Sequence, residues 1–203
     1  MRDPLNIHGV AGAGADYLGF IFYPGSKRYA GESLEKLTFL EATAGKLKVG
    51  VFVNEQPERV LALAGHYRLD LLQLHGNEPE TYCDTIRKAG FGVIKAFGVE
   101  EGFDFGRLIP YLPVCDYFLF DKKSDQHGGT GRKFRWDILK EYPYSIPFFL
   151  SGGIGPEDAG AIREINHPAF YAVDINSRFE LAPGMKDVDQ VKSFIREIKT
   201  FTP

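Results

Sequence analysis

Asp121 is the side chain in this sequence best placed for acid–base chemistry. It ends the apolar run CDYFLFDK (115–122) and leads toward the glycine-rich segment HGGTGRKF (127–134). A carboxyl group at the end of a buried strand can act as a general acid where its surroundings raise its pKa. A helix-capping Asp followed by a plain mobile loop is the alternative, because GGTG does not match the nucleotide-binding spacings.

Two consecutive turns indicate a phosphate site. The run PFFLSGGI (147–154) ends in glycines, and Pro156 marks the start of a helix. Backbone N–H groups in such a turn can approach a phosphate closely, and the helix dipole adds attraction. The next run, FYAVDINS (170–177), becomes polar at its end, and paired turns of this kind bind phosphate in (β/α)8 barrels. A plain strand-to-helix turn remains the alternative for the glycines.

Arg28 and His75 also follow apolar runs. Arg28 lies in the Pro/Gly loop of FIFYPGSKRYAG (20–31), where a guanidinium could pair with a substrate carboxylate through two parallel hydrogen bonds. A solvated surface arginine is the alternative. In LLQLHG (71–76), Gln73 and His75 alternate on a predicted buried strand. His75 could orient a ligand or a neighbour, or serve as a structural histidine.

Strands and helices must alternate to position these side chains. Short apolar runs suited to strands covered on both faces occur at 16–23, 46–53, 69–76, 91–98, 115–122, 147–154 and 170–177. Helix-like segments, with Pro and acids early and basic residues or Gly late, occur at 56–68, 77–90, 155–166 and 185–200. The chain opens with a predicted helix over 3–12, with Asp3 as N-cap and Pro4 in the first turn.

This order predicts one α/β domain spanning residues 1–203. Alternation of strand and helix is typical of a parallel sheet with helical crossovers. A complete (β/α)8 TIM barrel begins with a strand and has eight. The expected fold is therefore a TIM barrel that lacks strand 1 in this chain, with seven strands present, and an open doubly wound sheet is the alternative.

Composition excludes several classes of function. The formal net charge is -3 and the pI is about 6.0, and no basic block points to nucleic acid. No apolar run approaches the roughly 20 residues of a membrane span, and the N-terminus lacks a secretory pattern. Cys83 and Cys115 form neither a disulfide framework nor a metal cluster, and both are expected to be inert packing residues. We expect a cytoplasmic protein with no metal.

The motifs together resemble the phosphoribosylanthranilate isomerase family. The matching stretches run in family order over almost the whole chain: MRDPLN, GADYLGFIFYPGSKRY, VGVFVNE, LLQLHGNE, LFDKKSDQHGGTGRKFRW, FFLSGGIGPED and VDINSRFELAPGMKD. The resemblance implies an Amadori rearrangement without a cofactor. In it, N-(5-phosphoribosyl)anthranilate becomes 1-(2-carboxyphenylamino)-1-deoxyribulose 5-phosphate, a step of tryptophan biosynthesis. An aspartic acid protonates the ring oxygen, and a cysteine removes the C2 proton.

The resemblance also assigns roles to residues by motif match. Asp121 takes the role of the general acid, and Arg28 that of the group that binds the anthranilate carboxylate. Asp174 matches a further active-site acid, and His75 matches a motif position without an assigned role. The remaining matches fall in the phosphate-binding turns: Gly153, Gly155, Asn176 and Ser177. The expected partner is a small phosphorylated substrate.

The family pattern differs from this chain at its start. In the family, a strand ending in Cys-Gly precedes the position that matches Met1, and that cysteine is the general base. The resemblance therefore implies that the chain as given lacks the first strand and the base, and has little or no isomerase activity. A late internal Met taken as the start and a natural degenerate form are both open. Exposed strand edges predict either low stability or pairing with another chain. The protein is therefore expected to be a monomer or a homodimer.

Other functions fit parts of the pattern. Another phosphate-binding barrel of the tryptophan or histidine pathways is one alternative, either indole-glycerol-phosphate synthase or the histidine-pathway isomerase. The latter performs the same rearrangement with paired carboxylates. An alternative outside the enzymes is a non-catalytic phosphate-binding or scaffold protein.

Overall fold

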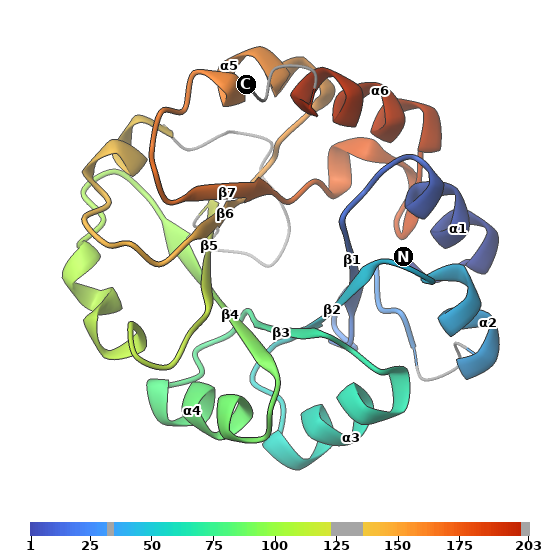
Figure 1. Cartoon of the computed structure of the whole chain (residues 1–203), viewed down its shortest axis with the longest axis horizontal. Coiled ribbons are helices and arrows are strands. Elements are labelled where there is room, and N and C mark those ends of the chain that lie inside the picture. The colour runs from blue at the N-terminus through green and yellow to red at the C-terminus, as the bar shows by residue number, and fades with distance from the viewer. Residues whose placement is uncertain (32–34, 123–135, 200–203) are drawn as a thin grey trace.

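The computed structural model describes residues 1–31, 35–122 and 136–199. Seven strands form one sheet in chain order, each parallel to the next. They are β1 (Tyr17–Ile21), β2 (Leu47–Phe52), β3 (Leu71–Leu74), β4 (Gly92–Val99), β5 (Tyr117–Lys122), β6 (Phe148–Leu150) and β7 (Phe170–Val173). Figure 1 shows the sheet curled into a ring with the helices outside it. The predicted seven-stranded α/β barrel is confirmed, and the open doubly wound sheet is wrong.

Helices cover the outside of the ring. The α-helices are α1 (Pro4–Gly12), α2 (Lys36–Ala42), α3 (Pro57–Tyr67), α4 (Glu80–Lys88), α5 (Ala159–Arg163) and α6 (Val188–Lys199). The first helix begins as predicted, because the Asp3 side chain accepts a hydrogen bond from the Asn6 backbone N–H at 2.8 Å. In the described part of the chain, no helix has both the length and the apolar character needed to cross a membrane.

Some connections differ from the helices expected of a barrel. Short 3₁₀ helices follow β4, β5, β6 and β7: η1 (Phe105–Tyr111), η2 (Trp136–Glu141), η3 (Pro156–Asp158) and η4 (Ser177–Phe179). The helix predicted over 185–200 is wrong at its start. Met185–Lys186 form the strand β9, which pairs antiparallel with β8 (Glu180–Ala182). A tertiary contact overrides local helix propensity here, since the Asn6 side chain bonds both backbone groups of Lys186 at 2.8 Å.

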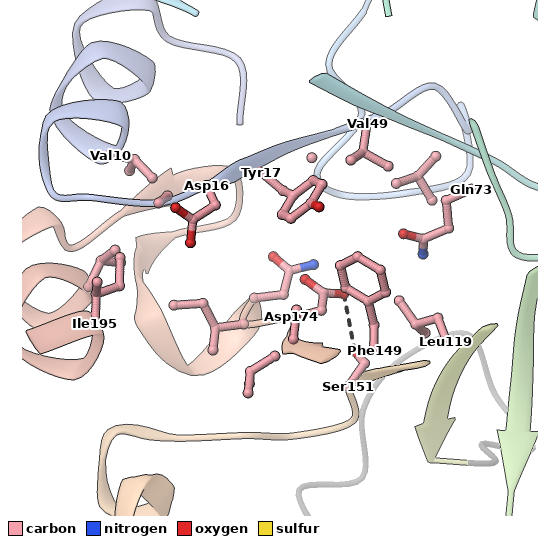
Figure 2. A pocket seen from close by; sticks show the side chains of 18 of the residues that line it. Val10, Asp16, Tyr17, Val49, Gln73, Leu119, Phe149, Ser151, Asp174 and Ile195 are labelled. Atoms are coloured by element: carbon pink, nitrogen blue, oxygen red, sulfur yellow. Dashed lines mark hydrogen bonds between the residues drawn. The ribbon is translucent and has the colours of Figure 1, made fainter. Parts of the chain in front are cut away.

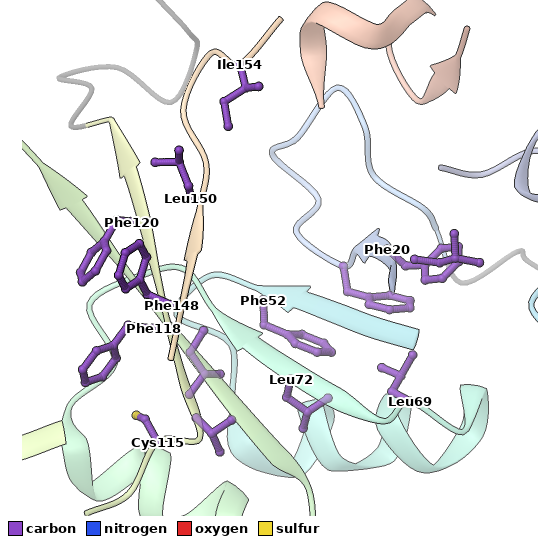
Figure 3. Close-up of a cluster of buried hydrophobic side chains, with 14 of the residues drawn as sticks. Phe20, Phe52, Leu69, Leu72, Cys115, Phe118, Phe120, Phe148, Leu150 and Ile154 are labelled. Atoms are coloured by element: carbon purple, nitrogen blue, oxygen red, sulfur yellow. The ribbon is translucent and has the colours of Figure 1, made fainter. Parts of the chain in front are cut away.

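Alternate residues of the strands pack on opposite faces of the sheet. The inner face carries a small apolar cluster that includes Val49, Leu119 and Phe149, and Figure 2 shows these side chains directed into the ring. The outer face carries the larger core against the helices, with Phe52, Phe118 and other buried side chains visible in Figure 3. The aromatic-rich apolar runs therefore supply both layers and fix which polar residues face inward.

The ring is open between its two terminal strands. In the described residues, β1 pairs only with β2, and β7 pairs only with β6. A cavity of about 770 Å³ extends along this opening and the ring interior. At the N-terminal end of the strands, the hydroxyls of Tyr17 and Tyr171 meet at 2.7 Å. Lys199 of α6 pairs with Asp16 at 2.8 Å, so β1 is tied to the C-terminal part of the domain at that end.

Candidate active site at the carboxyl ends of the strands

Most of the predicted site residues line one cavity. Because all seven strands are parallel, the loops after them meet at the same rim of the ring. The predicted residues that line the cavity there are Arg28, His75, Asp121, Gly153, Asp174, Asn176 and Ser177. Gly155 is the predicted residue that does not line it. The glycine-rich segment 127–134 lies outside the described residues.

Asp121 ends β5 beside a histidine. Its Oδ2 lies 3.3 Å from His75 Nε2, and its Oδ1 accepts the Lys122 backbone N–H at 2.7 Å. The other ring nitrogen of His75, Nδ1, lies 2.7 Å from the Gln73 amide nitrogen. An amide N–H can only donate, so this contact makes Nδ1 the acceptor and leaves the ring proton on Nε2, toward Asp121. Gln73 therefore fixes the ring that faces the candidate acid.

Asp174 provides a second carboxyl group at the end of β7. Its Oδ2 accepts a hydrogen bond from the Ser151 hydroxyl at 3.2 Å, a contact drawn in Figure 2. Burial raises the pKa of Asp174 above its ordinary value, and the nearby charge of Asp121 raises it further. Lys186 and His75 oppose that shift. The site thus holds two carboxyl groups that interact, Asp121 and Asp174.

A glycine brings the loop after β6 against Asp121. Gly152 has a φ of +94°, and a Cβ at this position would lie 2.9 Å from Asp121 Oδ1 and 2.6 Å from the Lys122 backbone nitrogen. Both the positive φ and the close approach require glycine. The SGG motif contains this residue, but nothing in the motif separates it from Gly153, whose Cβ would meet open space.

The turn around Gly155 is already internally bonded. The Gly155 N–H donates to the Asp158 carboxylate at 2.7 Å, and Arg178 and Glu157 form an ion pair at 2.7 Å beside it. A Cβ at Gly155 would lie 2.6 Å from Arg178 Nε. The Gly155 N–H is therefore engaged by Asp158, and the Arg178 and Glu157 side chains would have to move to admit a Cβ at this position.

A buried ion network lies under the rim between the first and last loops. Arg28 Nε donates to Glu180 Oε2 at 2.8 Å, and Lys186 Nζ contacts Glu180 Oε1 at 3.1 Å. Lys186 Nζ also donates to Asn176 Oδ1 at 2.6 Å. Burial opposes ionisation of Glu180, but the Lys186 charge and the hydrogen bonds from Lys186 and Arg28 hold its pKa below the ordinary value. Glu180 and Lys186 were not predicted as site residues from the sequence.

A second buried ion pair fixes the loop that carries His75. Lys95 Nζ lies 3.1 Å from Glu78 Oε2 and donates to the carbonyls of Leu74 and Gly76 at 3.0 and 2.8 Å. Glu78 in turn accepts the Gly76 N–H at 2.9 Å. Both side chains are nearly inaccessible, with 3% and 2% exposed. A lysine inside the apolar run FGVIKAFG was the available signal.

Neither cysteine reaches the cavity. Cys83 lies in α4, and Cys115 precedes β5; both are buried in the outer core, as predicted. In the ranges that the structure covers, no group of three or more His, Cys, Asp or Glu side chains could hold a metal ion. Among the described residues, the groups that line the rim are carboxyl groups, an imidazole, a guanidinium and backbone turns.

Comparison with known proteins shows which family the chain is similar to. A family model described as "PRAI: N-(5'phosphoribosyl)anthranilate (PRA) isomerase" matches residues 2–197. The N-(5'-phosphoribosyl)anthranilate isomerase of Parabacteroides distasonis is 46% identical over 200 residues, which is 98% of this chain and 90% of that protein.

Solved structures give the same result. The crystal structure of phosphoribosyl anthranilate isomerase from Thermotoga maritima has a TM-score of 0.84 and 36% identity, covering 98% of this chain and 96% of that one. An isomerase structure in complex with reduced 1-(o-carboxyphenylamino)-1-deoxyribulose 5-phosphate has a TM-score of 0.79 and 32% identity, covering 98% and 95%. The chain belongs to the phosphoribosylanthranilate isomerase family.

Proposed function

We propose that the cavity binds N-(5-phosphoribosyl)anthranilate and that its residues serve the Amadori rearrangement to 1-(2-carboxyphenylamino)-1-deoxyribulose 5-phosphate. The observation that carries the proposal is the convergence of Arg28, Asp121 and the Gly153 turn on one cavity in a chain of this family. The substrate has a carboxylate, a reacting ring and a phosphate, and these three groups match the three kinds of chemistry present.

Asp121 is proposed as the general acid that protonates the furanose ring oxygen. The oxygen then leaves C1, and the anilino nitrogen lone pair forms the Schiff base. His75 holds the Asp121 carboxyl through its Nε2, 3.3 Å from Oδ2. Gly152 supports the same carboxyl by allowing the loop after β6 to pack against it. Asp174, whose pKa is raised first by burial and then by the Asp121 charge, is proposed as a second carboxyl group near the reacting sugar.

Arg28 is proposed to bind the anthranilate carboxylate. Its Nε is engaged by Glu180, so the terminal guanidinium nitrogens are the groups that meet the substrate. At the other end of the cavity, the Gly153 backbone, Asn176 and Ser177 are proposed to bind the phosphate. Ser177 begins η4, and Gly153 has a φ of +73° in an open turn, which suits close approach of a phosphate to backbone donors.

Removal of the C2 proton is a separate step from ring opening. The rearrangement needs a base that takes this proton, giving an enolamine that becomes the ketone. Cys83 and Cys115 are buried in the outer core, so neither can reach a substrate in the cavity. We therefore expect substrate binding with slow turnover, limited by proton transfer from C2.

Turnover and binding can be tested separately. The chain is compared with a form that carries an additional N-terminal apolar segment ending in Cys-Gly, using substrate and product separated by chromatography. The proposal expects similar affinity for the reduced product analogue in both forms and turnover at least roughly 100-fold faster in the extended form. Equal turnover by both forms would refute the argument about the base.

Controls separate the acid from general charge effects. Asp121→Asn in the extended form should abolish most of the turnover, while Asp189→Asn, at an exposed position of α6, should leave it unchanged. If the protein converts the histidine-pathway aminoaldose but does not convert the anthranilate substrate, the assignment of substrate is contradicted. Binding of phosphate compounds without turnover in either form would support a non-catalytic protein instead.

A further inference from the structure

The hairpin formed by β8 and β9 carries a buried ion pair at the rim of the cavity. Glu180 and Lys186 are paired residues of the two strands, and their charged groups lie 3.1 Å apart with 4% and 9% of the side chains exposed. Burying two charges costs free energy unless further hydrogen bonds satisfy them. The remaining bonds made by these two groups therefore indicate what the pair does.

Each member of the pair contacts one proposed substrate-binding residue. Glu180 uses its second oxygen, Oε2, to accept from Arg28 Nε at 2.8 Å. Lys186 Nζ donates to Asn176 Oδ1 at 2.6 Å and to the Asn176 carbonyl at 3.0 Å. A continuous chain of four polar side chains thus joins the loop after β1 to the loop after β7.

The hairpin itself is held in place from several sides. Glu180 Oε1 accepts the Gly184 N–H at 3.1 Å, which closes the hairpin on its own carboxylate. The Asn6 side chain of α1 accepts from the Lys186 N–H and donates to its carbonyl. Because α1 and the hairpin are locked together, the two charged groups have fixed positions from which to orient their neighbours.

We propose that Glu180 and Lys186 are positioning residues that couple the carboxylate-binding and phosphate-binding ends of the cavity. Glu180 fixes the rotation of the Arg28 guanidinium by holding Nε, which leaves the two terminal nitrogens for a planar carboxylate. Lys186 engages the oxygen of the Asn176 amide, which leaves its nitrogen as a donor for a phosphate oxygen. This inference rests on the proposed substrate. It adds how the protein holds the group that binds the carboxylate and the group that binds the phosphate at a fixed separation.

A double-mutant cycle on ligand affinity tests the Glu180 half. Affinities for the reduced product analogue and for inorganic phosphate are measured by calorimetry on Glu180→Gln, Arg28→Ala and the double variant. A misplacement of about 1 Å can cost as much as 100-fold, so Glu180→Gln is expected to weaken the analogue 10- to 100-fold and phosphate less than roughly 2-fold. In the Arg28→Ala background, the same change should have an effect below roughly 2-fold.

The Lys186 half predicts weaker binding of phosphate, both as the free ion and as the phosphate group of the analogue. Lys186→Met should weaken inorganic phosphate roughly 10-fold or more, and this effect should fall below roughly 2-fold in the Asn176→Ala background. A purely structural ion pair would lower the thermal midpoint, would make Glu180→Gln weaken both ligands equally, and would leave the effect of Lys186→Met unchanged in the Asn176→Ala background. Independent, additive effects in both cycles would overturn the proposal.

Folding failure is handled by a matched variant. Removing one buried charge leaves the other without an ionic partner. The double change Glu180→Gln/Lys186→Met removes both charges at similar side-chain volume and is better tolerated. If a single variant does not fold, the pair variant is measured in its place. It must weaken the analogue by more than the loss expected from either substitution alone, and unchanged affinity overturns the proposal. If the wild-type chain binds phosphate but not the analogue, the proposed substrate is wrong. The Lys186 cycle then still tests whether Lys186 positions Asn176 for phosphate binding. Binding of neither ligand by the wild-type chain overturns both.

Discussion

The Nε2 atom of His75 lies 3.3 Å from Oδ2 of Asp121. The ring is held in this orientation from behind, because the Gln73 amide nitrogen contacts Nδ1 at 2.7 Å. The proton on the neutral ring is therefore directed at Asp121, and the carboxyl of the candidate acid has a fixed partner. Gln73 contacts the ring nitrogen opposite the one that faces Asp121, so its effect on the ring can be tested without the substrate.

Replacing Gln73 by Leu should remove the hydrogen bond that selects one tautomer of the His75 ring. Without the amide donor at Nδ1, we expect the neutral ring to sample both tautomers, which ¹⁵N chemical shifts of the His75 ring report directly. In the form with the added Cys-Gly segment, turnover should fall roughly 10-fold. Gln56→Leu, at an exposed position before α3, is the control. A single Nε2–H tautomer in both wild type and Gln73→Leu would contradict the assigned role.

Asp174 should make the domain less stable as the pH rises. Its folded-state pKa lies above the ordinary value because of burial first and the Asp121 charge second. The folded state therefore binds more protons than the unfolded state between the ordinary value near 3.9 and the raised pKa, and the free energy of unfolding falls as the pH rises through that window. Asp174→Asn should flatten this part of the stability curve and be more stable than wild type above it.

Thermal midpoints between pH 4 and 8 check the Asp174 prediction. Asp189→Asn serves as the control, because it removes a carboxylate from an exposed position and should run parallel to wild type. Equal pH dependence in Asp174→Asn and wild type would show that Asp174 ionises as freely in the folded chain as in the unfolded one.

Gly152→Ala should damage both stability and the acid site. The new Cβ would meet the Lys122 backbone at 2.6 Å in a residue with a φ of +94°, and strain of this kind costs about 1–3 kcal/mol. Gly65→Ala in α3 is the matched control, because its Cβ would meet nothing within 4 Å and Ala gains about 1 kcal/mol over Gly inside a helix. Urea unfolding of both variants measures the difference, and equal stabilities would refute the packing argument.

Lys95→Met should cost far more than loss of a surface lysine. The change leaves the buried Glu78 carboxylate without its ionic partner, which typically costs 3–5 kcal/mol. Lys88→Met removes an exposed lysine paired with Asp84 along α4 and should cost at most about 0.5 kcal/mol. Denaturant midpoints with equal m-values give both numbers. A Lys95→Met cost below about 1 kcal/mol would mean that Glu78 is satisfied by its backbone contacts alone.

The strands were predictable because their residues are apolar on both faces. Runs such as 46–53 and 115–122 are too short and too uniformly apolar for surface helices, and the glycines and prolines between them mark the turns. Parallel pairing then brings Arg28, His75 and Asp121 to one rim without further information. The motif matches added a proposed role for Arg28 and for Asp121, but none for His75.

The hairpin and its ion pair could not be predicted in the same way. Glu180 and Lys186 lie in short polar segments of three and two strand residues, with neither periodicity nor apolar runs to reveal them. Their importance comes from contacts with Asn6 and Arg28, more than 150 residues away in sequence. Gly152 likewise differs from Gly153 only through its approach to Asp121.

Titration of the 203-residue chain with reduced 1-(2-carboxyphenylamino)-1-deoxyribulose 5-phosphate tests the proposed site most directly. Calorimetry should show one site per chain, and Arg28→Ala should weaken binding at least roughly 10-fold while leaving the affinity for inorganic phosphate within roughly 2-fold. No detectable heat from the wild-type chain, or equal affinity in Arg28→Ala, would contradict the assignment of this cavity to a substrate with a carboxylate at one end and a phosphate at the other.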